Sequence, residues 1–371
     1  MADRSLDPSI DSFRELAGYF QLQGVLREAH RLGSGHINDT FLTDFDEAGG
    51  AVRYIFQRIN HDVFKNVPQL MENISRVTAH LAGKGDRRSA LKLVPTLGGE
   101  SYYETPKGEF WRVYLYVEGT RTYDRVENPR QAFEAARTFG RFQQALADLP
   151  DARLHESIPH FHDTPWRVVA LRKAAEADVA GRKKDVLAEL EFAFQREGEA
   201  GRLLDLARAG EIPERVTHND TKLNNVMLDD KTGEGICVID IDTVMPGLSL
   251  CDFGDLVRFA ANTGAEDEMD LAKVDVALPV FQAIAEGYIE SAGSILTNAE
   301  WDNLVFSARL ITYEIGIRFL TDYLQGDIYF KIKHPEHNLV RARSQLRLVD
   351  RMEAATGAME AIVRRLRPAC L

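Results

Sequence analysis

Three polar side chains near the middle of the sequence have the types and spacing that phosphoryl transfer requires. Asp220 lies two positions after His218, Asn225 lies five residues beyond Asp220, and Asp240 ends an apolar run. Phosphoryl transfer uses a carboxylate that faces the attacking hydroxyl, and oxygen ligands that hold Mg²⁺ on the nucleotide phosphates. The pattern therefore predicts Asp220 as the general base and Asn225 and Asp240 as ligands of Mg²⁺, with ATP as the phosphoryl donor.

A short hairpin explains how Asn225 and Asp240 come together although fifteen positions separate them. Residues 226–228 and 236–239 are apolar and favour two strands, and residues 229–235 between them are rich in turn formers. Such a hairpin returns Asn225 and Asp240 to the same end. Asp242 should point to the opposite face of the strand, unless a bend at the strand end brings it to a second metal ion.

Each of these residues also has a simpler explanation. A His-x-Asp pair often caps a loop, Asn225 is a common turn former, and a strand-end aspartate such as Asp240 often caps the next element of the chain. Taken together, in this order and around a hairpin, they favour a phosphotransferase. Lys222, two residues beyond the predicted base, is a candidate for contact with the γ-phosphate, although many loop lysines only face water.

This constellation resembles that of the aminoglycoside phosphotransferase and choline kinase family, a branch of the protein-kinase-like fold. Over nearly the whole chain, the sequence more closely resembles the N-acetylhexosamine 1-kinases, which phosphorylate GlcNAc or GalNAc at the anomeric hydroxyl. The segments that carry the closer resemblance are 33–40, 111–114, 160–165, 217–225, 239–243, 252–255, 316–330 and 335–340. The broad motif is specific for phosphotransfer, whereas the last two segments point toward the sugar kinases.

The resemblance also implies where the sugar binds. In the sugar 1-kinases a histidine that matches His36 lies near the substrate, and the stretch around Arg318 is distinctive of these enzymes. The alternative for Arg318 is an ion pair with Asp322 on the next helical turn. Phe259 is a candidate for packing on the apolar face of a pyranose, or else belongs to the core. Together with Asp220, these residues form the predicted substrate site.

The order of predicted elements indicates an α+β protein with a protein-kinase-like two-lobe fold. Residues 1–117 are predicted to form a small β-rich, nucleotide-binding N-lobe, an antiparallel sheet with one inserted helix. Residues 118–371 are predicted to form a mostly helical C-lobe with the catalytic loop and the substrate-binding helices. The helices predicted there cover 129–147, 166–209, 253–261, 270–292 and 299–324, with a last helix from about 336.

Two backbone segments are predicted to bind the nucleotide. Gly33-Ser34-Gly35 lies between two predicted strands, and its glycines allow backbone N–H groups to approach phosphate oxygens. Tyr116 and Val117 lie at the predicted hinge between the lobes, where backbone groups would bind the adenine edge.

The strand after the glycine turn departs from the usual kinase pattern. A lysine normally ends this strand and pairs with the nucleotide phosphates, but here the position is Gln57. Arg58 follows, although strand alternation points it to the opposite face. Either Gln57 binds a phosphate or Arg58 supplies the charge, and Mg²⁺ should neutralise more of the phosphate charge. Glu72 and Asn73 are the candidates for the residue that would orient such a lysine.

Two further motifs are interpreted as structural. Asp252-Phe-Gly spells the metal motif of protein kinases, but it lies twelve residues beyond Asp240 and opens a predicted helix. The resemblance implies that Asp252 braces the catalytic loop through backbone hydrogen bonds, and a helix N-cap is the simple physical alternative. His160, His162 and Asp163 could suggest a metal cluster, but no fourth ligand is nearby. Because Pro165 starts a predicted helix, Asp163 or Thr164 is predicted to cap it.

Composition limits the partners of the chain. A net charge of −12 and a pI near 5.4 argue against a nucleic-acid surface. No stretch of eighteen apolar residues and no apolar N-terminal signal core occur, so we expect no membrane partner and a cytoplasmic location. The expected partners are ATP and a small sugar, with the chain a monomer or a simple homo-oligomer.

Two alternatives remain open. Another hexose, an aminoglycoside or an amino alcohol such as choline could be the acceptor, although choline would require an aromatic cage for its quaternary nitrogen. A nucleotide-binding pseudokinase scaffold is suggested only by the missing lysine, and intact Asp220, Asn225 and Asp240 argue against it.

Overall fold

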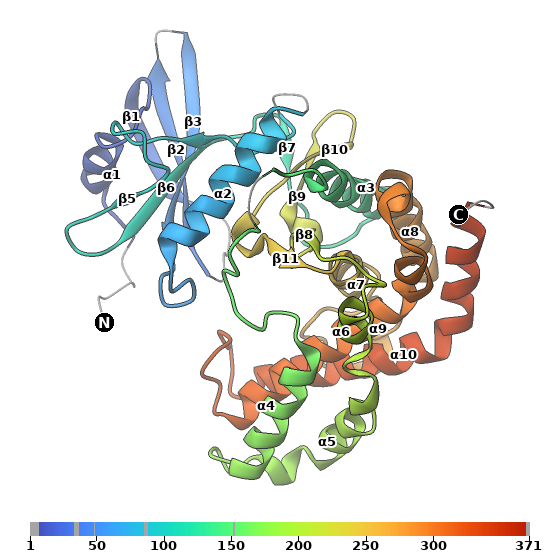
Figure 1. Cartoon of the computed structure of the whole chain (residues 1–371). Coiled ribbons are helices and arrows are strands. Elements are labelled where there is room, and N and C mark those ends of the chain that lie inside the picture. The colour runs from blue at the N-terminus through green and yellow to red at the C-terminus, as the bar shows by residue number, and fades with distance from the viewer. Residues whose placement is uncertain (1–6, 33–36, 48, 85–87, 151–152, 369–371) are drawn as a thin grey trace. The chain divides into compact units, whose positions relative to one another are not determined.

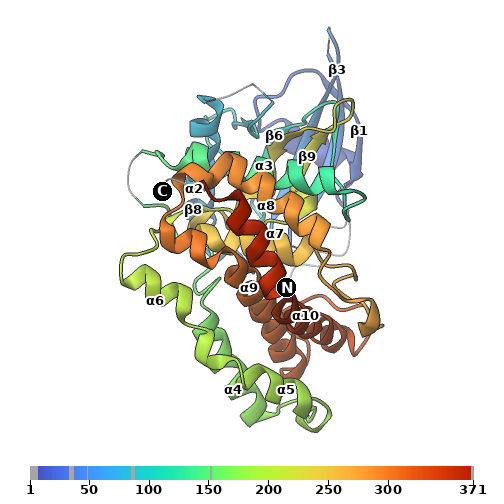
Figure 2. The same ribbon diagram turned by 90° about the vertical axis from the view of Figure 1, so that its right-hand side faces the viewer.

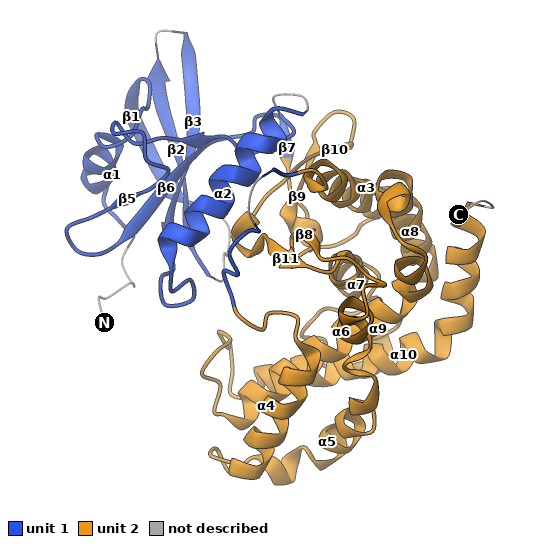
Figure 3. Cartoon of the chain, viewed as in Figure 1, with its two compact units in different colours: residues 1–120, 149–158 blue, residues 121–148, 159–371 orange. Residues whose placement is uncertain are grey.

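The computed structural model describes residues 7–368 apart from 33–36, 48, 85–87 and 151–152. The chain divides into two compact units, one of residues 1–120 with 149–158 and one of residues 121–148 with 159–371 (Figure 3). The first unit is built on an antiparallel sheet and the second largely on helices (Figure 1). These elements confirm the α+β prediction, whereas the predicted lobe boundary at residues 117–118 stays a prediction.

The first unit is an antiparallel sheet with strand order β1-β2-β3-β6-β4, and β5 pairs with β6. Its strands are β1 (Val25–Arg31), β2 (Asp39–Glu47), β3 (Gly50–Ile59), β4 (Leu93–Val94), β5 (Tyr103–Glu104) and β6 (Phe110–Leu115). Neighbouring residues of a strand point to opposite faces. On β6, Trp111 packs edge-on against Phe13 of α1 (Ile10–Ala17), whereas Arg112 reaches Met71 of α2 (Val67–Ala82). One helix therefore covers each face of the sheet (Figure 1).

The helix predicted after the third strand is present as α2, where Asn66 caps the N-terminus by accepting the backbone N–H of Gln69. The strand predicted over residues 91–97 is shorter than expected, because only Leu93–Val94 pairs with β6. Pro95 follows at once, and proline has no backbone N–H to donate to a neighbouring strand.

The second unit is largely helical. The α-helices described in it are α3 (Pro129–Leu146), α4 (Thr164–Ala177), α5 (Leu187–Phe194), α6 (Arg202–Arg208), α7 (Ser249–Ala260), α8 (Leu278–Ala292), α9 (Asn298–Leu324) and α10 (His337–Leu366). Of these, α4, α7 and α10 pack on the buried helix α9, and α3 packs on α8. Thr297 and Glu300 form a capping box at the start of α9. α9 and α10 lie side by side in both views (Figures 1 and 2), and α7 packs on α9 so closely that a Cβ at Gly254 would lie 2.5 Å from the carbonyl oxygen of Ser307.

Two helix predictions in this unit are wrong in their extent. The helix predicted over 166–209 is three helices, because Asp178 and Gly181 adopt positive φ angles of 41° and 67° that end α4. The helix predicted over 270–292 begins at Leu278, just before Pro279, and a separate 3₁₀ turn covers Leu271–Lys273. Proline favours the first turn of a helix, which explains this later start.

Two small sheets carry the segments predicted to do the chemistry. β9 (Val226–Asp229) pairs with β10 (Gly235–Val238), and β7 (Thr120–Arg121) lies beside β9. β8 (Arg215–Thr217) pairs with β11 (Met245–Gly247) and leads into the loop that contains Asp220. A Cβ at Gly247 would lie 2.3 Å from Oγ1 of Thr217, so this pairing requires glycine. No described helix is long and apolar enough to cross a membrane.

Candidate active site

The predicted hairpin is confirmed. Val226 pairs with Val238, and the N–H of Ile239 donates to the carbonyl oxygen of Asn225 over 2.9 Å. Asn225 and the chain leading into Asp240 therefore lie at the same end of the hairpin. The strand ends before Asp240, which adopts a left-handed backbone with φ 58°, and a 3₁₀ turn follows over Ile241–Thr243. Asp242 thus lies in a turn and not in the strand. The bend at the strand end, which the sequence analysis gave as an alternative to a straight strand, is therefore present.

Asp220 lies at the centre of a group of hydrogen bonds and charges. The side-chain amide of Asn225 donates to the Asp220 carbonyl oxygen over 2.8 Å and to Oδ2 of its carboxylate over 3.2 Å. The Lys222 ammonium lies 2.9 Å from the same Oδ2. Although burial alone would favour the neutral acid, the charge of Lys222 outweighs it and lowers the pKa of Asp220. The carboxylate remains ionised, yet 26% of its side chain is exposed and can meet a ligand.

Negative charge accumulates beside this group. The protein packed around the Asp240 carboxylate, together with the charges of Asp242 and Asp220, raises the pKa of Asp240 to about 6. Repulsion among carboxylates is what a divalent cation relieves, and carboxylate and amide oxygens are the donors that Mg²⁺ prefers. The donor set of Asn225, Asp240 and Asp242 therefore fits Mg²⁺.

Asp252 braces the backbone that precedes Asp220. Its Oδ2 accepts the N–H of His218 over 2.9 Å and its Oδ1 accepts the N–H of Asn219 over 2.7 Å. Gln143 donates a further hydrogen bond to Oδ2 over 2.6 Å. The bracing interpretation is therefore confirmed, whereas the N-cap alternative is wrong because α7 begins three residues earlier, at Ser249.

His218 is buried and ties the catalytic loop to the hairpin. Its Nδ1 accepts the N–H of Asp220 over 3.2 Å, and its Nε2 lies 3.0 Å from the carbonyl oxygen of Ile239. A carbonyl oxygen only accepts, so Nε2 carries the proton and Nδ1 carries the lone pair. The ring is therefore in its Nε2–H tautomer, packed edge-on against Phe139 and Phe142.

Arg318 packs against two aromatic rings. Its guanidinium carbon is 5.2 Å from the ring centroid of Phe161 and 5.7 Å from that of Phe330. Asp322 does not pair with it, because this carboxylate accepts the backbone N–H groups of residues 328–330 and the amide of Asn338. The ion-pair alternative for Arg318 is therefore wrong. Within the described part of the chain, no carboxylate oxygen lies within 4.0 Å of this guanidinium.

Phe259 is half-buried and lines a cavity of about 440 Å³ in the second unit. Arg258, Glu266 and Asp124 also line it, whereas Asp220 and Arg318 do not. Arg258 is neutralised by Asp255 at 2.7 Å and Glu266 at 3.0 Å. The structure therefore gives Phe259 an accessible face, but in a cavity separate from the other predicted substrate residues.

In the first unit, Gln57 is held by its neighbours on the sheet. Its amide nitrogen donates to Oγ1 of Thr40 over 3.0 Å, and its Oε1 accepts two hydrogen bonds from the guanidinium of Arg112 over 3.0 and 2.8 Å. Arg58 lies on the other face and pairs with Asp39 and Glu109. The charge of Arg58 is thus already neutralised. Sequence reasoning missed Arg112, because only the pairing of β3 with β6 places it opposite Gln57 and no local signal in the sequence marks it.

The structure describes only some of the other residues that were predicted to bind the nucleotide. Gly33, Ser34, Gly35 and His36 lie outside the described residues. The N–H of Tyr116 donates to the carbonyl oxygen of Arg53, and the carbonyl of Val117 accepts the Thr120 hydroxyl over 2.8 Å.

Glu72 and Asn73 serve the structure of the first unit. Glu72 lies 2.9 Å from Nε2 of His155, and Asn73 exchanges two hydrogen bonds with the His155 backbone. Both side chains thus anchor His155 to α2, and this role accounts for them without a lysine to orient.

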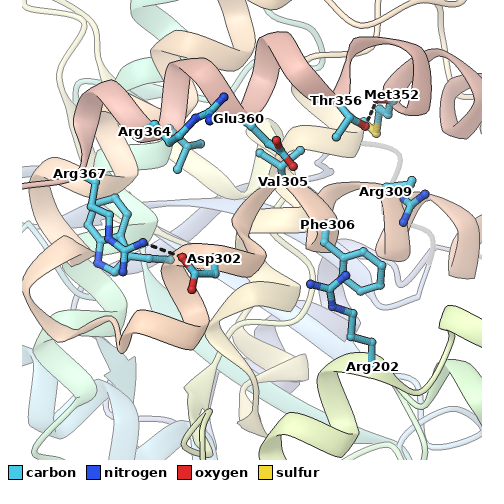
Figure 4. A pocket seen from close by; sticks show the side chains of 12 residues that line it. Arg202, Asp302, Val305, Phe306, Arg309, Met352, Thr356, Glu360, Arg364 and Arg367 are labelled. Carbon is cyan, nitrogen blue, oxygen red and sulfur yellow. Dashed lines mark hydrogen bonds and ion pairs between the residues drawn. The ribbon is translucent and has the colours of Figure 1, made fainter. Parts of the chain in front are cut away.

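A second cavity, of about 290 Å³, lies among α6, α9 and α10 (Figure 4). Arg309 on its wall is paired with Glu199 and Glu353, and Arg367 is paired with Asp302. None of the residues that line it belongs to the Asp220 group, so nothing connects this cavity with phosphoryl transfer.

Solved structures similar to this chain share its fold. An aminoglycoside phosphotransferase from Alicyclobacillus acidocaldarius matches with a TM-score of 0.62 at 13% identity, over 98% of this chain and 99% of its own. A spectinomycin phosphotransferase bound to ADP and spectinomycin matches with a TM-score of 0.59 at 13% identity, over 95% and 99%. Choline kinase from Cryptosporidium parvum matches with a TM-score of 0.54 at 13% identity, over 91% and 92%. These likenesses confirm the protein-kinase-like fold.

The family follows from the sequence itself. A model of the phosphotransferase enzyme family matches residues 28–286, which is more than half of the chain. The chain belongs to this family, and it is a phosphotransferase that acts on a hydroxyl acceptor.

Proposed function

We propose that the protein is an ATP- and Mg²⁺-dependent kinase that phosphorylates the anomeric hydroxyl of an N-acetylhexosamine, GlcNAc or GalNAc. The observation that carries the kinase chemistry is the ionised Asp220 carboxylate, held by Asn225 and Lys222 beside the hairpin end that bears Asp240. The choice of sugar rests on the resemblance to the 1-kinases and on the surroundings of Arg318.

Asp220 would orient the acceptor hydroxyl and accept its proton. Lys222 keeps the carboxylate ionised and hence able to accept, while the Asn225 amide fixes one carboxylate oxygen. The anomeric hydroxyl is more acidic than an ordinary sugar alcohol, so modest base strength suffices and orientation contributes the rest.

Asn225, Asp240 and Asp242 would hold Mg²⁺, which neutralises phosphate charge when bound to the nucleotide. The raised pKa of Asp240 supports this role, because the crowding of carboxylates that causes it is what a cation relieves. In the first unit, Gly33, Ser34 and Gly35 would contact the phosphates.

The charge of Arg318 supports a neutral acceptor. The relatives of similar fold act, by their names, on spectinomycin, choline and aminopropanol, so the fold itself does not select the acceptor. A guanidinium packed against Phe161 and Phe330 without a carboxylate partner would repel a cationic substrate such as choline or an aminoglycoside. It donates well to the hydroxyl and amide oxygens of an N-acetylhexosamine.

The test offers GlcNAc, GalNAc, their methyl glycosides, choline, aminopropanol and spectinomycin with Mg-ATP and measures ADP release. The proposal predicts turnover with at least one free N-acetylhexosamine and none with its methyl glycoside, whose anomeric oxygen is blocked. Phosphorus–proton correlation NMR should place phosphorus on C1. Phosphate on C6, or turnover with choline but not with the sugars, would contradict the sugar 1-kinase assignment.

A further inference from the structure

The segment just before α4 reaches the catalytic loop through a buried histidine that the phosphotransfer motif does not include. His162 is 8% exposed in its side chain, and its Nε2 lies 3.2 Å from the carbonyl oxygen of Asn219. Its Nδ1 lies 2.9 Å from Oε1 of Glu314 on α9, whose side chain is fully buried. Thr164 donates to the other Glu314 oxygen over 2.6 Å.

These contacts determine how many protons the His162 ring carries. A carbonyl oxygen and an ionised carboxylate only accept hydrogen bonds, so each ring nitrogen of His162 must donate. Only the doubly protonated imidazolium has two N–H groups. The Thr164 hydroxyl, which donates to the other oxygen of Glu314, favours the ionised carboxylate.

The charges packed around the ring agree with this state. Burial opposes a charge on His162, but the Glu314 carboxylate outweighs burial and raises the pKa of His162. Burial likewise favours a neutral Glu314, yet His162 lowers the pKa of Glu314. Asp255 on α7 adds attraction for the proton and Arg318 on α9 opposes it. Between the ordinary pKa values of glutamate, about 4.3, and of imidazole, about 6.5, this pair contributes fully to stability. The contribution is lost as pH rises through the raised pKa of His162 or falls through the lowered pKa of Glu314.

The peptide plane that leads into Asp220 is held at both of its polar ends. Its carbonyl, on Asn219, accepts from His162, and its N–H, on Asp220, donates to Nδ1 of His218. Asn219 has a positive φ of 65°, a conformation that costs free energy for a residue other than glycine and persists only where neighbours hold it. The orientation of the plane determines where the Asp220 side chain begins.

We propose that His162 is a positioning residue, a buried imidazolium that is anchored by Glu314 and holds the Asn219 carbonyl so that Asp220 faces the acceptor hydroxyl. Glu314 lies one helical turn before Arg318 on α9, and Phe161, which precedes His162, packs on the Arg318 guanidinium. The same short segment thus connects the catalytic loop with the proposed sugar site. The kinetic part of this inference rests on the proposed function, whereas the protonation state does not.

The first test is NMR of the full chain labelled with ¹⁵N-histidine. Two ring nitrogens with imidazolium shifts are expected at pH 6 and at pH 7, and His162→Gln should remove these signals. His218 should show one protonated and one unprotonated nitrogen. A neutral His162 ring at pH 7 would overturn the proposal whether or not the protein proves to be a sugar kinase.

The second test separates positioning from folding. Among correctly folded proteins, His162→Gln should lower kcat about 10- to 100-fold, the range for a misplaced reacting group, with little change in the KM for ATP. His160→Gln, an exposed histidine two residues away, is the matched control and should keep its kcat. Equal kcat values for the two variants would overturn the positioning role.

Glu314→Gln refines this comparison. The side-chain amide of this variant can donate to Nδ1 of a neutral His162 ring, so the Nε2–H of His162 still holds the Asn219 carbonyl. This variant should turn the ring neutral in the NMR spectrum and retain kcat within about threefold of wild type, less than RT ln 3 or about 0.7 kcal/mol. A loss as large as that of His162→Gln would show that the charge, not the hydrogen bond, matters and would overturn the positioning role.

Discussion

Replacing Asp252 with Asn should destabilise the protein strongly while leaving its need for Mg²⁺ intact. The Asp252 carboxylate is 1% exposed and accepts hydrogen bonds from the backbone N–H groups of His218 and Asn219 and from Gln143. Asn has the same shape, but one of its two side-chain positions becomes an NH₂ donor that must face a backbone N–H donor. Gln143 cannot rotate its amide to compensate, because its oxygen accepts the Tyr288 hydroxyl over 2.5 Å.

The magnitude follows from the groups left without partners. At least one backbone N–H and the new amide N–H lose their acceptors in a buried site, and each costs about 1–3 kcal/mol. The free energy of unfolding should therefore fall by about 2–6 kcal/mol, a large part of the about 5–15 kcal/mol that stabilises a typical protein. Urea denaturation followed by circular dichroism measures this change, and nucleotide binding titrated with Mg²⁺ measures the metal requirement. An unchanged unfolding midpoint combined with lost Mg²⁺ dependence would refute the bracing role and make Asp252 a metal ligand.

Three further predictions concern the metal and the acceptor. Asp240→Asn should weaken Mg²⁺-dependent ATP binding at least tenfold because a hard anionic oxygen is lost. Asp230→Asn in the hairpin turn is the control and should leave this binding unchanged. Calorimetry that shows equal Mg²⁺ affinity for the two variants would contradict the metal assignment. Because the pKa of Asp240 is about 6 without metal and Mg²⁺ requires the carboxylate, Mg²⁺ affinity should be about tenfold lower at pH 5 than at pH 7.5, and no change would count against this ligand. Arg318→Gln should raise the KM for the sugar about 10- to 100-fold by removing a charged donor while the KM for ATP stays constant, and Arg309→Gln on the same helix is the control.

The phosphotransfer motif could be predicted from the sequence because its residues are close together along the chain. The hairpin of β9 and β10 was visible in two apolar runs around a turn, and it alone brings Asn225 and Asp240 together. The long helices α3 and α9 were visible in their periodicity and caps. Local patterns of this kind determine local structure, so they survive in the fold.

Contacts between distant segments could not be predicted in the same way. His162 meets Glu314 across 152 positions of the chain, and no periodicity connects the two residues. The break after α4 depends on the left-handed backbone of Asp178, a residue that also occurs within helices. Arg112 was missed because its partner Gln57 lies on a different strand, and only the pairing of the two strands brings them together.

For Arg318 and Asp252 the sequence allowed two roles each, and only the hydrogen-bond and ion-pair partners in the structure distinguish them. Arg318 and Asp322 have the spacing of a helical ion pair, yet Asp322 is taken by the backbone of residues 328–330. Asp252 has the place of a helix cap in the sequence, but its partners lie in the catalytic loop. In both cases the competing acceptors and donors come from outside the local segment.

The most direct test of the central claim is the turnover of Asp220→Asn with Mg-ATP and an N-acetylhexosamine. Asn keeps the shape of the side chain and an oxygen that can accept the Asn225 amide, but it cannot accept a proton. The kcat should therefore fall by about 10²–10⁴, the usual contribution of a positioned general base. ATP affinity and the unfolding midpoint should remain close to those of wild type, because Asp220 is not assigned to the nucleotide or the core. A folded Asp220→Asn protein that retains more than half of the wild-type rate would contradict the assignment.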